Sequence, residues 1–220
     1  MISKIGYYDV NEEWISQQKN PLHDQSAFSP PDESDWAKQA NIWIDLAHSC
    51  MQTELLPKYQ YHVIDRCLRG ASDIISCETT AVHSNTASLI QWCKQWSKGA
   101  VTKYAVIFDQ MKYAREGKPP THRQVCEARH KDTNKRFFTA EHKFPIMIPK
   151  KGIRDRGWTL EESRDWMWQH SRVTIVTQEE NKRLLPFTED MKIASKRYEE
   201  ANIEVCIHPK YLAEGEDDAN

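Results

Sequence analysis

Apolar residues recur at three- and four-residue steps through most of the first half of the chain, which is the pattern of amphipathic helices. The pattern begins at Ser34, which can cap the first helix, and proline or glycine residues close the helical segments. The predicted helices span 34–57, 61–75, 85–99 and 101–116. We therefore expect an α-helical domain over residues 34–118, preceded by an irregular arm, 1–33, that ends in a proline-marked polar segment.

The pattern changes after Pro120. A short helical stretch over 121–130 is followed by two β-prone runs, 136–143 and 144–149, and then by a glycine-containing loop. Thr159 and Glu162 form the capping-box pattern of a further helix. A β-branched strand over 173–177 and a helix over 178–185 complete the unit, so the order is strand, long loop with an inserted helix, strand, helix.

A helix over 190–201 and an alternating strand over 203–207 follow, and the chain ends in an acidic tail, 209–220. The predicted fold class is therefore α+β. A mainly α-helical N-terminal domain is followed by a small mixed domain over residues 119–208, and the tail is expected to be solvated.

The composition is that of an ordinary soluble protein. The 220 residues are 39% hydrophobic and 28% charged, and no run of about 18 apolar residues is long enough to span a bilayer. The first residues do not have the pattern of a secretory leader, so a cytoplasmic location is expected. Six cysteines without a Cys-x-x-Cys pair predict reduced, buried thiols and argue against a zinc ribbon.

The charge is distributed unevenly, although the net charge is only −2. Residues 101–156 contain 14 Lys or Arg against 6 Asp or Glu, whereas acidic residues outnumber basic ones on both sides. A block of cations is what binding to a phosphate backbone requires. A solvated face neutralised by the acidic flanks is the alternative. The candidate nucleic-acid contacts are Lys131, Lys135, Arg136, Lys143, Lys150, Lys151, Arg154 and Arg156.

Glu141-His142 stands at the end of a predicted strand, and a later strand, 173–177, continues into a helix that contains Asn181. This arrangement, over about residues 134–185, resembles the HNH (ββα-metal) endonuclease family. There, an acidic-His or His-His pair ends the first strand, and an Asn or His on the helix faces it. Thr177 and Glu180 stand where many members have cysteines. The resemblance implies an HNH-like domain over 119–208 of a metal-dependent endonuclease that hydrolyses phosphodiester bonds in DNA, or else RNA.

The resemblance also implies roles for individual residues. His142 would be the general base, and Glu141 and Asn181 would bind one divalent ion, Mg²⁺ or Mn²⁺, since oxygen ligands favour these ions. The residue before the second strand would be His170, which can fix the loop or add a ligand, or Arg172, which can contact the phosphate. Small HNH proteins are often encoded by phages, mobile elements or bacterial defence loci.

Two features of the sequence depart from the compact members of the family. His142 and Asn181 are separated by 39 positions, so the segment 158–170 is expected to be an insertion. Neighbouring residues of a regular strand point to opposite faces, so Glu141 and His142 share one site only if the strand ends or bulges there.

Two other functions remain open. The chain is alternatively a non-catalytic nucleic-acid-binding protein that uses the basic region 101–156, or a helical protein-interaction or inhibitor module. The expected partners are nucleic acid, most simply DNA, and a protein bound through the helical domain, with no membrane contact. His122, Cys126 and His130 form a loose cluster that is more simply explained by packing than by a metal.

Overall fold

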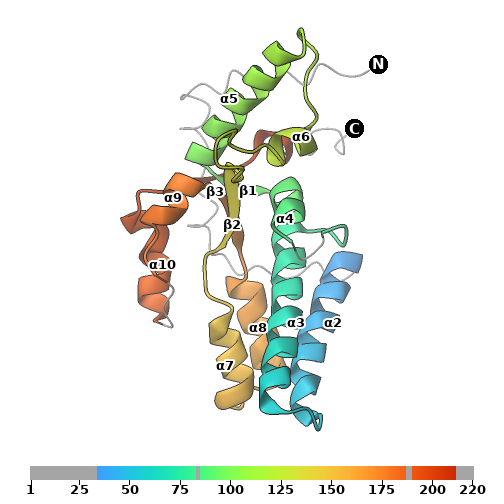
Figure 1. Cartoon of the computed structure of the whole chain (residues 1–220). Coiled ribbons are helices and arrows are strands. Elements are labelled where there is room, and N and C mark those ends of the chain that lie inside the picture. The colour runs from blue at the N-terminus through green and yellow to red at the C-terminus, as the bar shows by residue number, and fades with distance from the viewer. Residues whose placement is uncertain (1–33, 83–84, 187–189, 212–220) are drawn as a thin grey trace, which may run out of the picture.

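The computed structural model of the chain describes residues 34–82, 85–186 and 190–211. These residues form an α+β fold in which helices surround a small four-stranded sheet (Figure 1). The predicted arm, 1–33, and most of the acidic tail lie outside the described residues. The helices are α2 (Asp35–Ser49), α3 (Pro57–Cys77), α4 (Thr86–Trp92), α5 (Lys98–Ala114), α6 (His122–Cys126), α7 (Met147–Asp155), α8 (Leu160–His170), α9 (Gln178–Arg183) and α10 (Met191–Glu200), with short 3-10 turns at Cys50–Gln52 and Pro209–Tyr211.

Most of the helices, though not α3 and α7, begin at a side chain that caps their first amide groups. Ser34 Oγ accepts a hydrogen bond from the amide of Ala37, and Asn85 does the same for Ser88. Thr159 and Glu162 form the predicted capping box of α8, and Thr177 and Glu180 form another at the start of α9. Local sequence therefore determines where most of these helices start.

The sheet brings together segments from both halves of the chain. Its strands are β1 (Gln95–Ser97), β2 (Phe138–His142), β3 (Val173–Thr177) and β4 (Val205–Ile207), in the order β2-β3-β1-β4. β2 and β3 are antiparallel and regularly paired from Phe138↔Thr177 to His142↔Val173. β1 runs parallel to β3 and antiparallel to β4. α9 follows β3 directly, and α7 and α8 lie between β2 and β3, so the order from β2 onward is strand, two helices, strand, helix.

One hydrophobic core extends across the predicted boundary at residue 118. It includes Ile44 and Leu68 from the first half of the chain and Phe138, Met167 and Ile175 from the second half, all of them fully buried. β1 lies between β3 and β4 in the same sheet. The helical segment 34–118 therefore shares this core with the segment 119–208, which also contains a smaller separate cluster of Val176, Tyr198, Ala201, Ile203 and Val205.

Three sequence predictions of secondary structure were wrong. The helix expected over 85–99 ends at Trp92, and Trp96 lies instead in β1, where it pairs with Ile175 and Cys206. Tertiary pairing overrides a helical spacing that is only a few residues long. The end of the β-prone run 144–149 and most of the predicted glycine-containing loop instead form helix α7, which has Pro149 in its first turn and Gly152 in its interior. The indole of Trp158 packs so closely on Gly152 that a side chain at this position would overlap it.

Candidate functional site

Glu141 lies near the end of β2 and faces helix α10. Its carboxylate accepts a 2.8 Å hydrogen bond from Arg197, and the side chains are only 10% and 3% exposed, respectively. Burial raises the pKa of Glu141 overall, although the charge and the hydrogen bond of Arg197 act to lower it. The carboxylate is therefore part of a buried ion pair.

Arg197 also binds the backbone around Glu141. Its guanidinium donates to the carbonyl oxygen of Leu185 at 2.9 Å and to that of His142 at 3.3 Å. Thr174 pairs with Glu141 across the strands, and burial raises the pKa of the neighbouring Tyr198 phenol. Arg197 thus connects β2, the segment after α9, and α10 through a single side chain.

His142 points to the opposite face of the sheet from Glu141. Its Nδ1 lies 3.2 Å from Oγ of Ser72 on α3, and the residue is half-buried. Desolvation, followed by the positive charge of Arg69, lowers its pKa to about 4, although Asp65 acts in the opposite direction. The imidazole is therefore uncharged at neutral pH. Since β2 remains regularly paired through His142↔Val173, no bulge turns the two side chains toward one site.

A group of charged residues on α3 and α7 lies on the side of His142. Asp65 accepts hydrogen bonds from Arg69 at 2.9 Å and from Lys150 at 2.7 Å. Burial acts against the ionised form of Asp65, but these two cations lower its pKa overall. Lys150 also lies 3.6 Å from the centre of the Tyr61 ring. Arg69 is the more accessible cation, with its side chain 46% exposed, and it lies one helical turn from Ser72.

Asn181 is half-buried on α9, which begins at the other end of the β2–β3 ladder from His142. The four residue steps from Phe138 to His142 correspond to about 13 Å along an extended strand. Among the described residues, no hydrogen bond joins Asn181 to Glu141 or His142. The structure therefore does not bring the three predicted residues together around one point.

His170 and Arg172 lie beside the end of β2. Their side chains contact aromatic rings and backbone carbonyl groups next to the strand. The His170 ring packs near Phe144 and Trp166, with centroid distances of 5.1 and 5.2 Å. Burial and then the charges of Lys143 and Arg172 lower its pKa. Arg172 donates to the carbonyl oxygens of Trp168 and Ser171. These contacts anchor the loop between α8 and β3.

The donor set implied by the resemblance does not fit a divalent ion in this structure. Glu141 is engaged by a guanidinium, and among the described residues no hydrogen bond joins it to Asn181. Across the part of the chain that the structure describes, no group of three or more His, Cys, Asp or Glu residues is placed to bind a metal. We therefore derive no catalytic step through an ion at Glu141 and Asn181.

The predicted nucleic-acid contacts fall into two groups separated by β2. Lys131, Lys135 and the half-buried Arg136 precede the strand, whereas Lys150, Lys151, Arg154 and Arg156 belong to α7 and its end. Lys143 and Lys150 are each 5% exposed, so neither presents the accessible cation that a phosphate contact needs. Lys151 and Arg154 are half-buried, and Arg156 is exposed.

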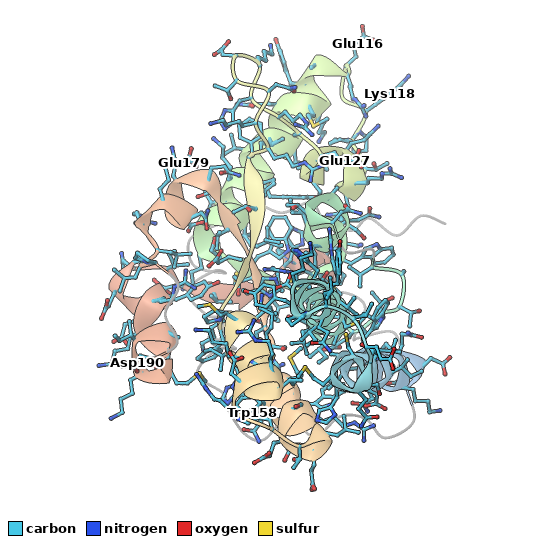
Figure 2. All side chains as sticks on the ribbon, turned by 60° about the horizontal axis from the view of Figure 1, so that its bottom comes forward. Glu116, Lys118, Glu127, Trp158, Glu179 and Asp190 are labelled. Atoms are coloured by element: carbon cyan, nitrogen blue, oxygen red, sulfur yellow. The ribbon has the colours of Figure 1, made fainter. Side chains whose placement is uncertain are left out.

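Exposed cations also gather on α5, α6 and the turn before β2, and we call this group the basic end. Figure 2 shows Glu116, Lys118 and Glu127 at this end of the molecule and Trp158 toward the opposite end. A few acidic residues are interspersed, such as Glu127, which pairs with Arg123. The basic end consists of Lys112, Arg115, Lys118, Arg123, Arg129, Lys131 and Lys135.

The cluster around His122 has a structural explanation. His122 contacts the Tyr104 hydroxyl at 3.0 Å, the carbonyl oxygen of Gln91 at 3.0 Å and the Cys126 thiol, and its ring lies 5.2 Å from that of His208. Burial, followed by the charge of Lys210, lowers the pKa of His122 to about 4. His130 instead packs against Phe137. The cluster is a packed group of uncharged rings.

Sequence reasoning did not identify the residues that contact the Glu141-His142 pair. Ser72 is 70 positions before His142, and Arg197 is 56 positions after Glu141. Arg197 lies on the inward face of α10 with Ala194 and Tyr198. The one signal in the sequence that pointed to a buried position for Arg197 was its helical spacing with these residues.

Comparisons with known proteins do not identify a family: no family model matches the chain, and no curated protein or solved structure is significantly similar to it. Within the described residues, none of the helices combines the length and apolar character needed to cross a bilayer.

Proposed function

We propose that this protein is an endonuclease that hydrolyses phosphodiester bonds in nucleic acid, with His142 as the general base. The observation that carries the proposal is the environment of His142. It is half-buried at the end of β2, its Nδ1 lies against Ser72, and it is uncharged at neutral pH. The antiparallel β2–β3 pair followed by α9 supports the same proposal, because HNH nucleases share this order once α7 and α8 are treated as an insertion between the strands.

In this proposal the Nδ1–H of His142 donates to Ser72 Oγ, which leaves Nε2 unprotonated. Nε2 accepts a proton from the attacking water while the water oxygen forms its bond to phosphorus. The leaving oxygen takes a proton from solvent while the bond between that oxygen and phosphorus breaks. An imidazole with a pKa of about 4 is a weak base. General base catalysis usually contributes about 10²–10⁴-fold, so we expect a contribution near the lower limit.

Arg69 would attract the substrate phosphate to this side of the sheet. Its charge is among the causes of the lowered His142 pKa, so its field acts at the imidazole. Its partner Asp65 is shared with Lys150, which leaves net positive charge around the three side chains. Cations of this kind supply the attraction to a phosphate backbone.

The test is cleavage of supercoiled plasmid and of a labelled RNA by wild type, His142→Ala and His62→Ala, with Mg²⁺, Mn²⁺ or EDTA. His62 is the matched control because it is an exposed histidine on α3. We expect cleavage by wild type and His62→Ala, and a rate at least about 100-fold lower for His142→Ala. Equal rates for a folded His142→Ala variant would contradict the assignment.

A second function, nucleic-acid binding without cleavage, is favoured by the Glu141–Arg197 pair, which removes an expected metal ligand. In this case the basic end would provide the contacts. We expect Lys131→Glu/Lys135→Glu to weaken binding to a fluorescent oligonucleotide and to reduce the slope of log affinity against log salt by about two. Lys182→Glu on α9 is the control. Salt-sensitive binding by wild type with no cleavage of any substrate would select this function.

A further inference from the structure

The acidic residue of the ββα unit has a partner that belongs to this chain. Arg197 Nη2 and Glu141 Oε1 are 2.8 Å apart, and both side chains are almost completely buried. A guanidinium at this distance neutralises a carboxylate as a bound cation would. We propose that Arg197 takes the place of a divalent ion at Glu141, so that the end of β2 carries an internal ion pair and no metal site.

With Arg197 in place, the surroundings of Glu141 are unsuited to a hydrated cation. Mg²⁺ and Mn²⁺ are hard ions that bind oxygen, and Mg²⁺ usually retains several water molecules. Glu141 is 8% exposed, and its neighbours on that face are Thr174 and Tyr198. While Arg197 is bound to the carboxylate, an ion would therefore have to displace the guanidinium to reach it.

Displacing Arg197 would also break contacts that have no connection with Glu141. The same guanidinium holds the carbonyl oxygens of Leu185 and His142. Each partly buried acceptor that loses its donor costs free energy. A metal would have to compensate for all three contacts, whereas the arginine satisfies them simultaneously.

The position of Arg197 follows from α10. The helix is capped by Asp190, whose side chain accepts from the amides of Lys192 and Ile193. Ala194, Arg197 and Tyr198 then occupy one face at spacings of three and four residues and point inward. The cation is therefore supplied by the fold itself.

The experiment is a Mn²⁺ titration of the full chain, followed by electron paramagnetic resonance of free Mn²⁺, for wild type, Glu141→Gln and Arg197→Met. Glu199→Gln is the control because Glu199 is an exposed carboxylate of the same helix. We expect wild type, Glu141→Gln and Glu199→Gln to bind Mn²⁺ equally weakly. In Arg197→Met the Glu141 carboxylate has lost its cation, so we expect tighter binding of Mn²⁺. Adding Glu141→Gln to Arg197→Met should abolish this gain.

Wild-type binding that Glu141→Gln weakens tenfold or more would overturn the proposal. If Arg197→Met does not fold, the comparison of wild type with Glu141→Gln decides alone. The readout is independent of cleavage, so a protein that cuts no substrate still gives a result here, and failure of this proposal leaves the assignment of His142 intact.

Discussion

Replacing Arg197 with methionine is expected to lower the free energy of unfolding by about 3–5 kcal/mol, which is the usual cost of removing one partner of a buried ion pair. The substitution leaves the Glu141 carboxyl buried and deprives the carbonyl oxygens of Leu185 and His142 of their donor. Urea unfolding at pH 7 followed by circular dichroism measures the change. A loss of this size is a large part of the roughly 5–15 kcal/mol that stabilises a typical domain.

Arg164→Met is the matched control. Arg164 makes a bidentate contact with Asp45, but the two side chains are 39% and 40% exposed, so we expect a loss below about 1 kcal/mol. Adding Glu141→Leu to Arg197→Met is expected to restore much of the lost stability, because the buried charge is then gone. Equal losses for Arg197→Met and Arg164→Met would show that burial does not set the strength of the Glu141 pair.

The protein is expected to lose stability as the pH falls below about 6.5. Burial lowers the pKa values of His122 and His142 to about 4, and that of His208 well below its ordinary value. Between pH 6.5 and pH 4 the unfolded chain therefore binds more protons than the folded one, so acid favours unfolding. At pH 5 we expect each of His122 and His142 to contribute about 2 kcal/mol of destabilisation relative to pH 7.

Urea unfolding at pH 7.5, 6.5 and 5.5 measures this dependence. His122→Gln removes one titrating group and retains an amide beside Tyr104 and Gln91, so it should make the dependence on pH less steep. His62→Gln, at an exposed position on α3, should leave the dependence unchanged. A free energy of unfolding that stays constant or increases between pH 7.5 and 5.5 would be inconsistent with uncharged buried imidazoles.

The sequence predicted the elements whose signals are local. The capping box at Thr159 and Glu162 begins α8, and the β-branched run 173–177 forms β3 with the predicted bounds. The α+β class follows from the same signals. Trp96 and the 144–149 run were predicted wrongly. A short apolar run fits both the helical and the strand spacing, and contacts with residues distant in sequence determine which structure forms.

The site could be predicted only in part for the same reason. Glu141 and His142 were expected at the end of a strand, and β2 places them there. The partner that each side chain contacts is supplied by α10 or α3, and both helices lie far from β2 in sequence. The sequence contains no local signal for Ser72 and, for Arg197, only its helical spacing with Ala194 and Tyr198, so their contacts with the Glu141-His142 pair were not foreseen.

The dependence of the cleavage rate on pH tests the central claim, that His142 is the general base, most directly. The measurement is single-turnover cleavage from pH 4 to pH 8, normalised to the folded fraction. We expect the rate to be constant above about pH 5 and to fall by half near pH 4, the pKa of His142, and this acid limb should be absent in His142→Ala. A rate that continues to rise through pH 7, or a profile that is the same in His142→Ala, would contradict the account.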